Sequence, residues 1–312
     1  MNLIKLLPFV SLMLLAPSNL DLFIHHEGQA IMKFVRSDFE MLALPIIDEE
    51  KLQSVVQQLE RKVYRMPKDA VIGQRGEIVP ETLGSKLDRQ KLVSRMEAFF
   101  YEGDTSVIET PMSPVYPKVD GELLAFIREK RIGSYVTYFN SRNRNRTHNI
   151  ELAANAINNT VIFQGEQFSF NKVVGIRTSA KGYTRAPVIV RGELSEDIGG
   201  GICQVSSTLF NAIDRAGLRI IHRYSHSRSI SYVPSGRDAT VSWGGPDFVF
   251  QNVYDQPILI RASTGNGAMY VTIYSSEVID FTPREVPGTT RELPDEVELQ
   301  SSETGRSQPG RP

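Results

Sequence analysis

The sequence predicts an α+β protein, with a small N-terminal α+β domain followed by a domain built on a mixed, mainly antiparallel sheet that carries a cysteine-bearing helix. Two stretches, at about 48–66 and 87–103, repeat apolar residues at three- and four-residue steps, which is typical of amphipathic helices. Residues 238–276 hold short β-like segments at even spacing, as in a compact sheet. Apolar residues at helical spacing also follow the single cysteine.

The composition is that of an ordinary globular chain. Its 312 residues are enough for two modest domains. The net charge of −1 lacks the basic excess of nucleic-acid-binding proteins, so we expect no nucleic-acid partner. One cysteine excludes an intrachain disulfide and a cysteine-rich zinc site. We expect neither a metal nor a cofactor.

The first residues, MNLIKLLPFVSLMLLAPSN, have the pattern of an export leader. Lys5 supplies a short positive region, and an apolar run extends from Leu6 to Ala16. This run is shorter than the about 20 residues that span a bilayer, and it fits the apolar core of a secretory signal peptide. We therefore assign residues 1–30 to an export segment; the alternatives are an uncleaved anchor and a buried N-terminal helix. The expected location is extracytoplasmic, either secreted or wall-associated.

Residues 36–120 are expected to form the small α+β domain. Asp48 is a good N-cap for the first helix, which Pro67 should stop, and a second helix is expected between Asp88 and Gly103. The stretch between these helices alternates short β-like pieces with glycine turns, and prolines interrupt an edge strand at 107–119. Residues 121–133 read as a short helix or linker.

Residues 133–278 are expected to form the sheet domain. After a strand near 135–141, Asn149 is the expected N-cap of a helix, and residues 160–171 read as a hairpin. Residues 219–233 predict a strand pair or one long bent strand. From 280 to 312 the chain is rich in Pro, Glu, Thr, Ser and Gly, which predicts a disordered tail.

The stretch GGGICQVSSTLFNA, residues 199–212, places the cysteine at the start of a helix. Apolar residues continue at helical spacing to Ala216, and Gly217 suits the position after the last turn, so we expect a helix over 203–216. Unpaired N–H groups and the helix dipole at this end favour a thiolate over a thiol. The glycines leave the sulfur approachable and offer N–H groups to an oxyanion.

A cysteine nucleophile needs a base, and three histidines are candidates: His148, His222 and His226. The last two are four residues apart on a β-like stretch, which would place both on one side. The residue that orients the base is left open among four candidates: Asp197, Asn211, Ser231 and Asp238. The simplest alternative is a buried cysteine that acts only as a small apolar side chain.

Five blocks of the sequence resemble the VanW family. They are NRTHNIELAANAIN, GEQFSFNKVVGIRT, KGYTRAPVI, GGGICQVSSTLFNA and HSRSISYVPSGRDATV, and they fall in the family's order over residues 134–275. The stretch PKDAVIGQRGEIVPETLGSKLD is similar to the peptidoglycan-binding domain that commonly precedes such domains. The family takes its name from glycopeptide-resistance clusters.

The resemblance implies a cell-wall protein that acts on peptidoglycan stem peptides. Some VanW-domain proteins are assigned L,D-transpeptidase activity, which forms an acyl-enzyme on cysteine. Carried to this chain, the motifs make Cys203 the nucleophile, select His226 as its partner and give Asp238 the orienting role. The oxyanion and substrate positions are Arg146, Gly200, Gly201, Ile202, Gln204 and Ser227.

The implied partner is peptidoglycan, with a peripheral association to the cell envelope. The alternatives are a non-catalytic peptidoglycan-binding or envelope-assembly protein, or a glycopeptide-resistance accessory protein.

Overall fold

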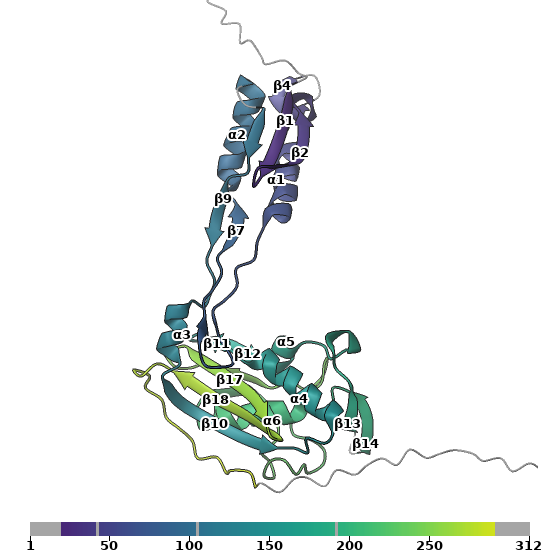
Figure 1. Cartoon of the computed structure of the whole chain (residues 1–312), viewed down its shortest axis with the longest axis vertical. Coiled ribbons are helices and arrows are strands. Elements are labelled where there is room, and N and C mark those ends of the chain that lie inside the picture. The colour runs from purple at the N-terminus through teal and green to yellow at the C-terminus, as the bar shows by residue number, and fades with distance from the viewer. Residues whose placement is uncertain (1–19, 42–43, 104–105, 191–192, 291–312) are drawn as a thin grey trace, which may run out of the picture. The chain divides into compact units, whose positions relative to one another are not determined.

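The computed structural model describes residues 20–41, 44–103, 106–190 and 193–290 (Figure 1). The chain divides into two compact units, with the boundary after Gly121. The expected leader, apart from its last residues, lies outside the described residues, and so does the part of the expected tail beyond residue 290. The mixture of helices with mainly antiparallel sheets confirms the predicted α+β class.

The first unit packs two helices against a three-stranded sheet (Figure 1). Strand β1 is central in the order β2-β1-β8, antiparallel to β2 and parallel to β8. The elements are β1 (Asp21–His26), β2 (Gln29–Val35), η1 (Arg36–Phe39), β3 (Glu40–Met41), β4 (Leu44–Ile47), α1 (Glu49–Val63), β5 (Val71–Ile72), β6 (Ile78–Val79), β7 (Gly84–Leu87), α2 (Arg89–Glu102), β8 (Val107–Glu109) and β9 (Met112–Val115).

Both predicted helix starts of this unit are confirmed. The Asp48 side chain accepts a hydrogen bond from the N–H of Lys51, and Asp88 does the same for Lys91. Gly103 ends α2 with a φ of 68°. The unit also begins earlier than residue 36. Leu22 and Ile24 of β1 are fully buried in the core beside α1 and α2, so residues 21–35 belong to the folded unit.

The second unit is built on a four-stranded antiparallel sheet in the order β10-β18-β17-β11. Asn266 and Gly267 both have positive φ and close the tight turn between β17 and β18, which suits the twist of an antiparallel hairpin. The elements are α3 (Gly121–Ile127), β10 (Lys130–Tyr138), α4 (Arg144–Ile157), β11 (Thr160–Ile162), β12 (Gln167–Ser169), α5 (Phe170–Val174), η2 (Ser179–Lys181), β13 (Arg185–Val190), β14 (Glu193–Ile198), α6 (Ile202–Arg215), β15 (Arg219–His222), β16 (Val249–Gln251), β17 (Ile258–Gly265) and β18 (Ala268–Ser275).

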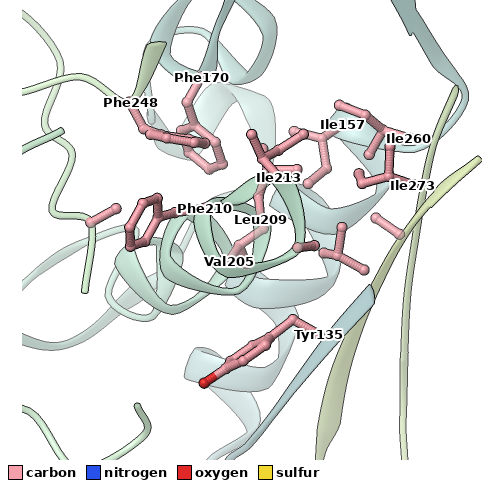
Figure 2. Close-up of a cluster of buried hydrophobic side chains, with 14 of the residues drawn as sticks. Tyr135, Ile157, Phe170, Val205, Leu209, Phe210, Ile213, Phe248, Ile260 and Ile273 are labelled. Atoms are coloured by element: carbon pink, nitrogen blue, oxygen red, sulfur yellow. The ribbon is translucent and has the colours of Figure 1, made fainter. Parts of the chain in front are cut away.

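Helices α4 and α6 contact each other and pack on this sheet. Figure 2 shows α6 in the middle of the core, with Ile157, Ile260 and Ile273 on one side of it and Phe248 on the other. A second sheet, β12-β16-β15, and the separate hairpin β13-β14 complete the unit. Burial on several sides fixes α6, and with it the position of the cysteine.

Three local expectations for this unit are wrong. Asn149 is not the N-cap of α4: the N-cap is Asn143, six residues earlier, and its side chain accepts from the N–H of Arg146. The segment 160–171 is no hairpin, because β11 pairs with β17 whereas β12 pairs with β16. Only residues 219–222 of the expected long strand are a strand, and residues 223–248 form a loop.

The first residues of the expected tail are ordered against the second unit. Val286 is buried, the hydroxyl of Tyr135 donates to the carbonyl of Pro287, and Thr289 donates to the carbonyl of Val136. Arg284 pairs with Asp214 of α6 at 2.9 Å. The polar composition of 280–290 predicted disorder, but Arg284 and the apolar side chains of Phe281 and Val286 contact the second unit.

Candidate active site

Cys203 is the second residue of α6 and lies in its first turn. Gly201 is the N-cap, with a φ of 106°, a conformation that residues with a side chain rarely adopt. The helix continues to Arg215, with Gly217 at a positive φ just beyond it, close to the expected span. Cys203 is partly exposed, while the next turns of the helix are buried in the core.

The loop 223–248 brings His226 and Asp238 to the sulfur. Oδ2 of Asp238 accepts from the backbone N–H of His226 at 2.6 Å and lies 2.7 Å from its Nδ1. The carboxylate therefore holds a proton on Nδ1 and leaves Nε2 for the sulfur. The side chains of His226 and Cys203 interact, and this interaction shifts the pKa of both groups. We call Cys203, His226 and Asp238 the cysteine triad.

The electrostatics of the triad favour a thiolate–imidazolium pair. Burial alone would raise the pKa of Cys203, but the hydrogen bond and charge of His226 outweigh it and lower this pKa. For His226, burial opposes protonation, and the interactions with Cys203 and Asp238 overcome it and raise the pKa. The pKa of Asp238 is lowered, because its hydrogen bonds with His226 outweigh the burial that opposes its charge. The sulfur also lies 3.6 Å from Oγ1 of Thr240 and 3.5 Å from the carbonyl of Val241.

Helix α6 itself holds the segment that carries Asp238. One turn after Cys203, the Ser207 hydroxyl accepts from the N–H of Ala239 at 2.9 Å. Two turns after it, the Asn211 amide donates to the carbonyl of Arg237 at 2.8 Å. The same helix therefore fixes the nucleophile and the orienting carboxylate relative to each other.

The glycine run, residues 199–201, is held in place by contacts with α4 and β13. The Asn149 side chain donates to the carbonyl of Gly200 at 3.0 Å, and Gly200 packs against the backbone of Ala186. The N–H of Ile202 is used by the carbonyl of Gly199. The N–H of Cys203 donates to no acceptor among the described residues, which leaves it for an oxyanion.

Replacing Gly200 by alanine should destabilise the second unit by about 1–3 kcal/mol, the usual cost of overpacking. A Cβ at this position would lie 2.5 Å from the carbonyl oxygen of Ala186, so the backbone must move. Urea unfolding followed by the fluorescence of Trp243, the single tryptophan, reports this unit alone. Gly265→Ala is the matched control, because its Cβ meets nothing within 4 Å. Equal unfolding midpoints for the two variants would contradict the close packing of the glycine run.

Arg146 and Gln204 are joined, but not to the sulfur. Nη2 of Arg146 donates to Oε1 of Gln204 at 2.7 Å, and the Gln204 amide donates to Thr137 and to the carbonyl of Tyr138. Gln204 is fully buried, so its side chain ties α6 to β10. Ile202 is a core residue.

The remaining candidates from the sequence lie away from these contacts. Ser227 is exposed. His148 bonds the carbonyl of Gly182, and His222 is exposed on β15. The carboxylate of Asp197 accepts from the next residue's N–H, and Ser231 is exposed. Because residues 223–248 are a loop, His222 and His226 do not share a strand face.

Several residues that build the site were not predicted from the sequence to belong to it. Asn149, Ser207, Thr240 and Val241 contact the triad or the glycine run, as described above. Arg177 interacts electrostatically with Cys203. Asn149, Ser207, Thr240, Val241 and Arg177 all lie within the quoted sequence blocks, and only the fold shows which of their atoms meet.

Among the described residues, no group of three or more His, Cys, Asp or Glu side chains is arranged to hold a metal ion. In the same part of the chain, no helix has the length and apolar character needed to cross a membrane.

Two family models match the chain. The one described as "VanW like protein" matches residues 145–274, which include the cysteine triad, and the one described as "Putative peptidoglycan binding domain" matches residues 27–108. The chain is 54% identical over 279 residues to "Uncharacterized protein YoaR" of Bacillus subtilis (strain 168), covering 89% of this chain and 92% of that protein. It is 34% identical over 116 residues to "Vancomycin B-type resistance protein VanW" of Enterococcus faecalis (strain ATCC 700802 / V583), covering 36% of this chain and 42% of that protein. No solved structure matches the chain.

Proposed function

The chain belongs to the family of VanW-like proteins, as its sequence blocks predicted, and from this premise we propose that it is a cysteine acyl transferase of L,D-transpeptidase type. It is a cell-wall-related protein, with a peptidoglycan-binding family match ahead of the VanW-like domain. The proposed substrates are peptidoglycan stem peptides, and the proposed location is outside the cytoplasmic membrane. The observation that carries the proposal is the cysteine triad, in which Asp238 lies 2.7 Å from Nδ1 of His226 and the His226 imidazole lowers the pKa of Cys203.

In the first half of the reaction, the Cys203 thiolate attacks the carbonyl carbon of an amide bond in the donor stem. The resulting oxyanion collapses, the carbon–nitrogen bond breaks, and the leaving amine takes a proton from the His226 imidazolium. The products are a thioester on Cys203 and a free amino acid. Asp238 keeps the imidazole oriented and stabilises its charge.

In the second half, an amine of a neighbouring stem attacks the thioester. His226 takes the proton that this amine loses, the carbon–sulfur bond breaks, and a new amide forms with the thiolate restored. Water in place of the amine gives hydrolysis. Both halves use the same imidazole in opposite directions, and its raised pKa favours the imidazolium form that protonates the leaving amine.

The start of α6 supports the oxyanion assignment. The N–H of Cys203 has no acceptor among the described residues, and the same holds for Gly200 and Gly201. Free N–H groups and the positive end of the helix dipole are suited to a negative oxygen. The Ile202 N–H is already used, so we assign the oxyanion to the glycine amides and to Cys203.

The decisive experiment is intact-protein mass spectrometry after incubation with a stem tetrapeptide. We expect a mass increase equal to the tripeptide acyl group, mapped to Cys203 and absent after alkylation with iodoacetamide. A protein that alkylates readily yet never gains an acyl group, and that still binds purified sacculi, would instead be the non-catalytic peptidoglycan-binding protein. Direct binding of a glycopeptide drug, unaffected by alkylation, would favour the resistance accessory role.

A further inference from the structure

Two arginine stems lie against the glycine run that leads to Cys203. A Cβ on Gly199 would sit 3.3 Å from Cβ and Cγ of Arg177, and a Cβ on Gly201 would sit 3.0 Å from Cγ of Arg146. Arg146 comes from the first turn of α4, whereas Arg177 comes from the loop after α5. The side chains of two arginines from separate elements therefore lie beside the glycine run.

Neither arginine forms an ion pair with a carboxylate among the described residues. Arg146 is bonded to the neutral amide of Gln204. For Arg177, Nη2 donates to Oδ1 of Asn171 at 2.7 Å, and Nη1 is buried with no acceptor. A buried donor without an acceptor is costly, so Nη1 of Arg177 calls for a partner.

The carboxylate that acts on Arg177, that of Asp247, is hydrogen-bonded to other groups. Asp247 interacts electrostatically with Arg177, but one of its oxygens accepts from the Ser169 hydroxyl and the other from the N–H of Asn171. The Asn171 amide in turn donates to the carbonyls of Ser242 and Pro246. This network fixes Arg177 beside the loop whose Val241 carbonyl contacts the sulfur. It provides no ion pair for the Arg177 guanidinium.

The thiolate is not a sufficient partner for Arg177. The sulfur already contacts Thr240 and Val241 and is charge-paired with His226. In the acyl-enzyme it becomes a neutral thioester, so an arginine matched only to the thiolate would lose its anion midway through the reaction. A carboxylate of the donor stem suits the planar guanidinium better, since the two form charge-assisted hydrogen bonds.

We propose that Arg177 binds the α-carboxylate of the residue that leaves when Cys203 attacks, and so selects donor peptides that end one residue beyond the scissile bond. This inference rests on the proposed function. The carboxylate of a terminal residue is joined to the attacked carbonyl through one nitrogen and one Cα only, and Arg177 lies against Gly199, four residues before Cys203, so the two groups can meet near the sulfur. A longer donor, or one with a blocked end, would leave Arg177 without its anion.

The test compares two tetrapeptide donors that differ only in a free C-terminal carboxylate or a C-terminal amide. The wild-type protein should acylate on Cys203 about 10- to 100-fold faster with the free acid, the range expected for one charge-assisted contact. Arg177→Gln should lose this preference by slowing the acid and leaving the amide almost unchanged, and Arg177→Lys should keep part of it. Arg144→Gln, which removes an exposed charge two residues from Arg146, should behave as the wild type.

Equal rates for the two donors in the wild type would overturn the inference. So would an Arg177→Gln variant that slows both donors equally and moves the pH dependence of Cys203 alkylation, because that pattern belongs to a partner of the thiolate. If neither donor acylates the wild type, the proposed function fails, and the inference is then judged by binding. Calorimetry on Cys203→Ala should give about 10-fold tighter binding of the acid, lost when Arg177→Gln is added; equal affinities would reject it.

Discussion

Alanine in place of Cys203 is expected to abolish acyl-enzyme formation and stem-peptide transfer while leaving the second unit folded. Cys203 is the only cysteine of the chain, so no other thiol can carry the acyl group. Loss of a nucleophile from a working triad lowers turnover by at least about 10⁴-fold. The measurement is the rate of transfer between two stem peptides, followed by mass spectrometry of products.

The fold of this variant is checked by urea unfolding followed through Trp243. The Cys203 side chain packs at the edge of the core and is partly exposed, so its truncation should cost about 1 kcal/mol. Binding to sacculi should persist, because the peptidoglycan-binding match covers residues 27–108 only. Transfer that continues at the wild-type rate in a folded Cys203→Ala protein would end the catalytic proposal.

Removal of the His226 imidazole should have the second largest effect, on two separate readouts. The hydrogen bond and charge of His226 lower the pKa of Cys203, so His226→Ala should raise that pKa and reduce the thiolate fraction at pH 7. Iodoacetamide labelling measured across pH should accordingly begin at a higher pH than in the wild type. Transfer should fall by about 10²- to 10⁴-fold, the usual contribution of a general acid–base group.

His222→Ala is the matched control for this change. It removes an imidazole four residues away that is exposed on β15 and pairs through its backbone with Val249. Its labelling profile and its transfer rate should equal those of the wild type. An unchanged labelling profile in His226→Ala would show that the helix start alone ionises the sulfur, and that the imidazole is not coupled to it.

The sequence predicted the parts of the fold that follow from local chemistry. Asp48 and Asp88 cap their helices as expected, because a carboxylate just ahead of an amphipathic stripe has few other places to bond. The cysteine helix was predicted to within one residue from its stripe and Gly217. These features depend on neighbours in the chain, which a sequence displays directly.

The predictions were wrong where contacts with a segment far along the chain determine the local structure. Asn149 has the composition of a cap, yet its side chain is buried and bonds the carbonyls of Thr184 and Gly200, some 35 and 51 residues away. The loop after β15 was predicted to be a strand, because apolar and polar residues alternate there. This alternation does not show that the backbone N–H of His226 bonds the Asp238 side chain instead of a neighbouring strand. Arg177 lay in a quoted block without a predicted role, since nothing in the local sequence shows that it interacts with Cys203.

The contact of residues 280–290 with α6 matters for the choice of a C-terminal truncation of this protein. Asp214 holds Arg237 from the loop and Arg284 from the C-terminal segment at once, and Arg237 directly precedes Asp238. A fragment cut where the family match stops, at residue 274, would remove one of the two cations from this clamp. Such a fragment keeps every residue of the cysteine triad and yet discards part of the scaffold that steadies it, so the boundary of the working domain lies nearer residue 290.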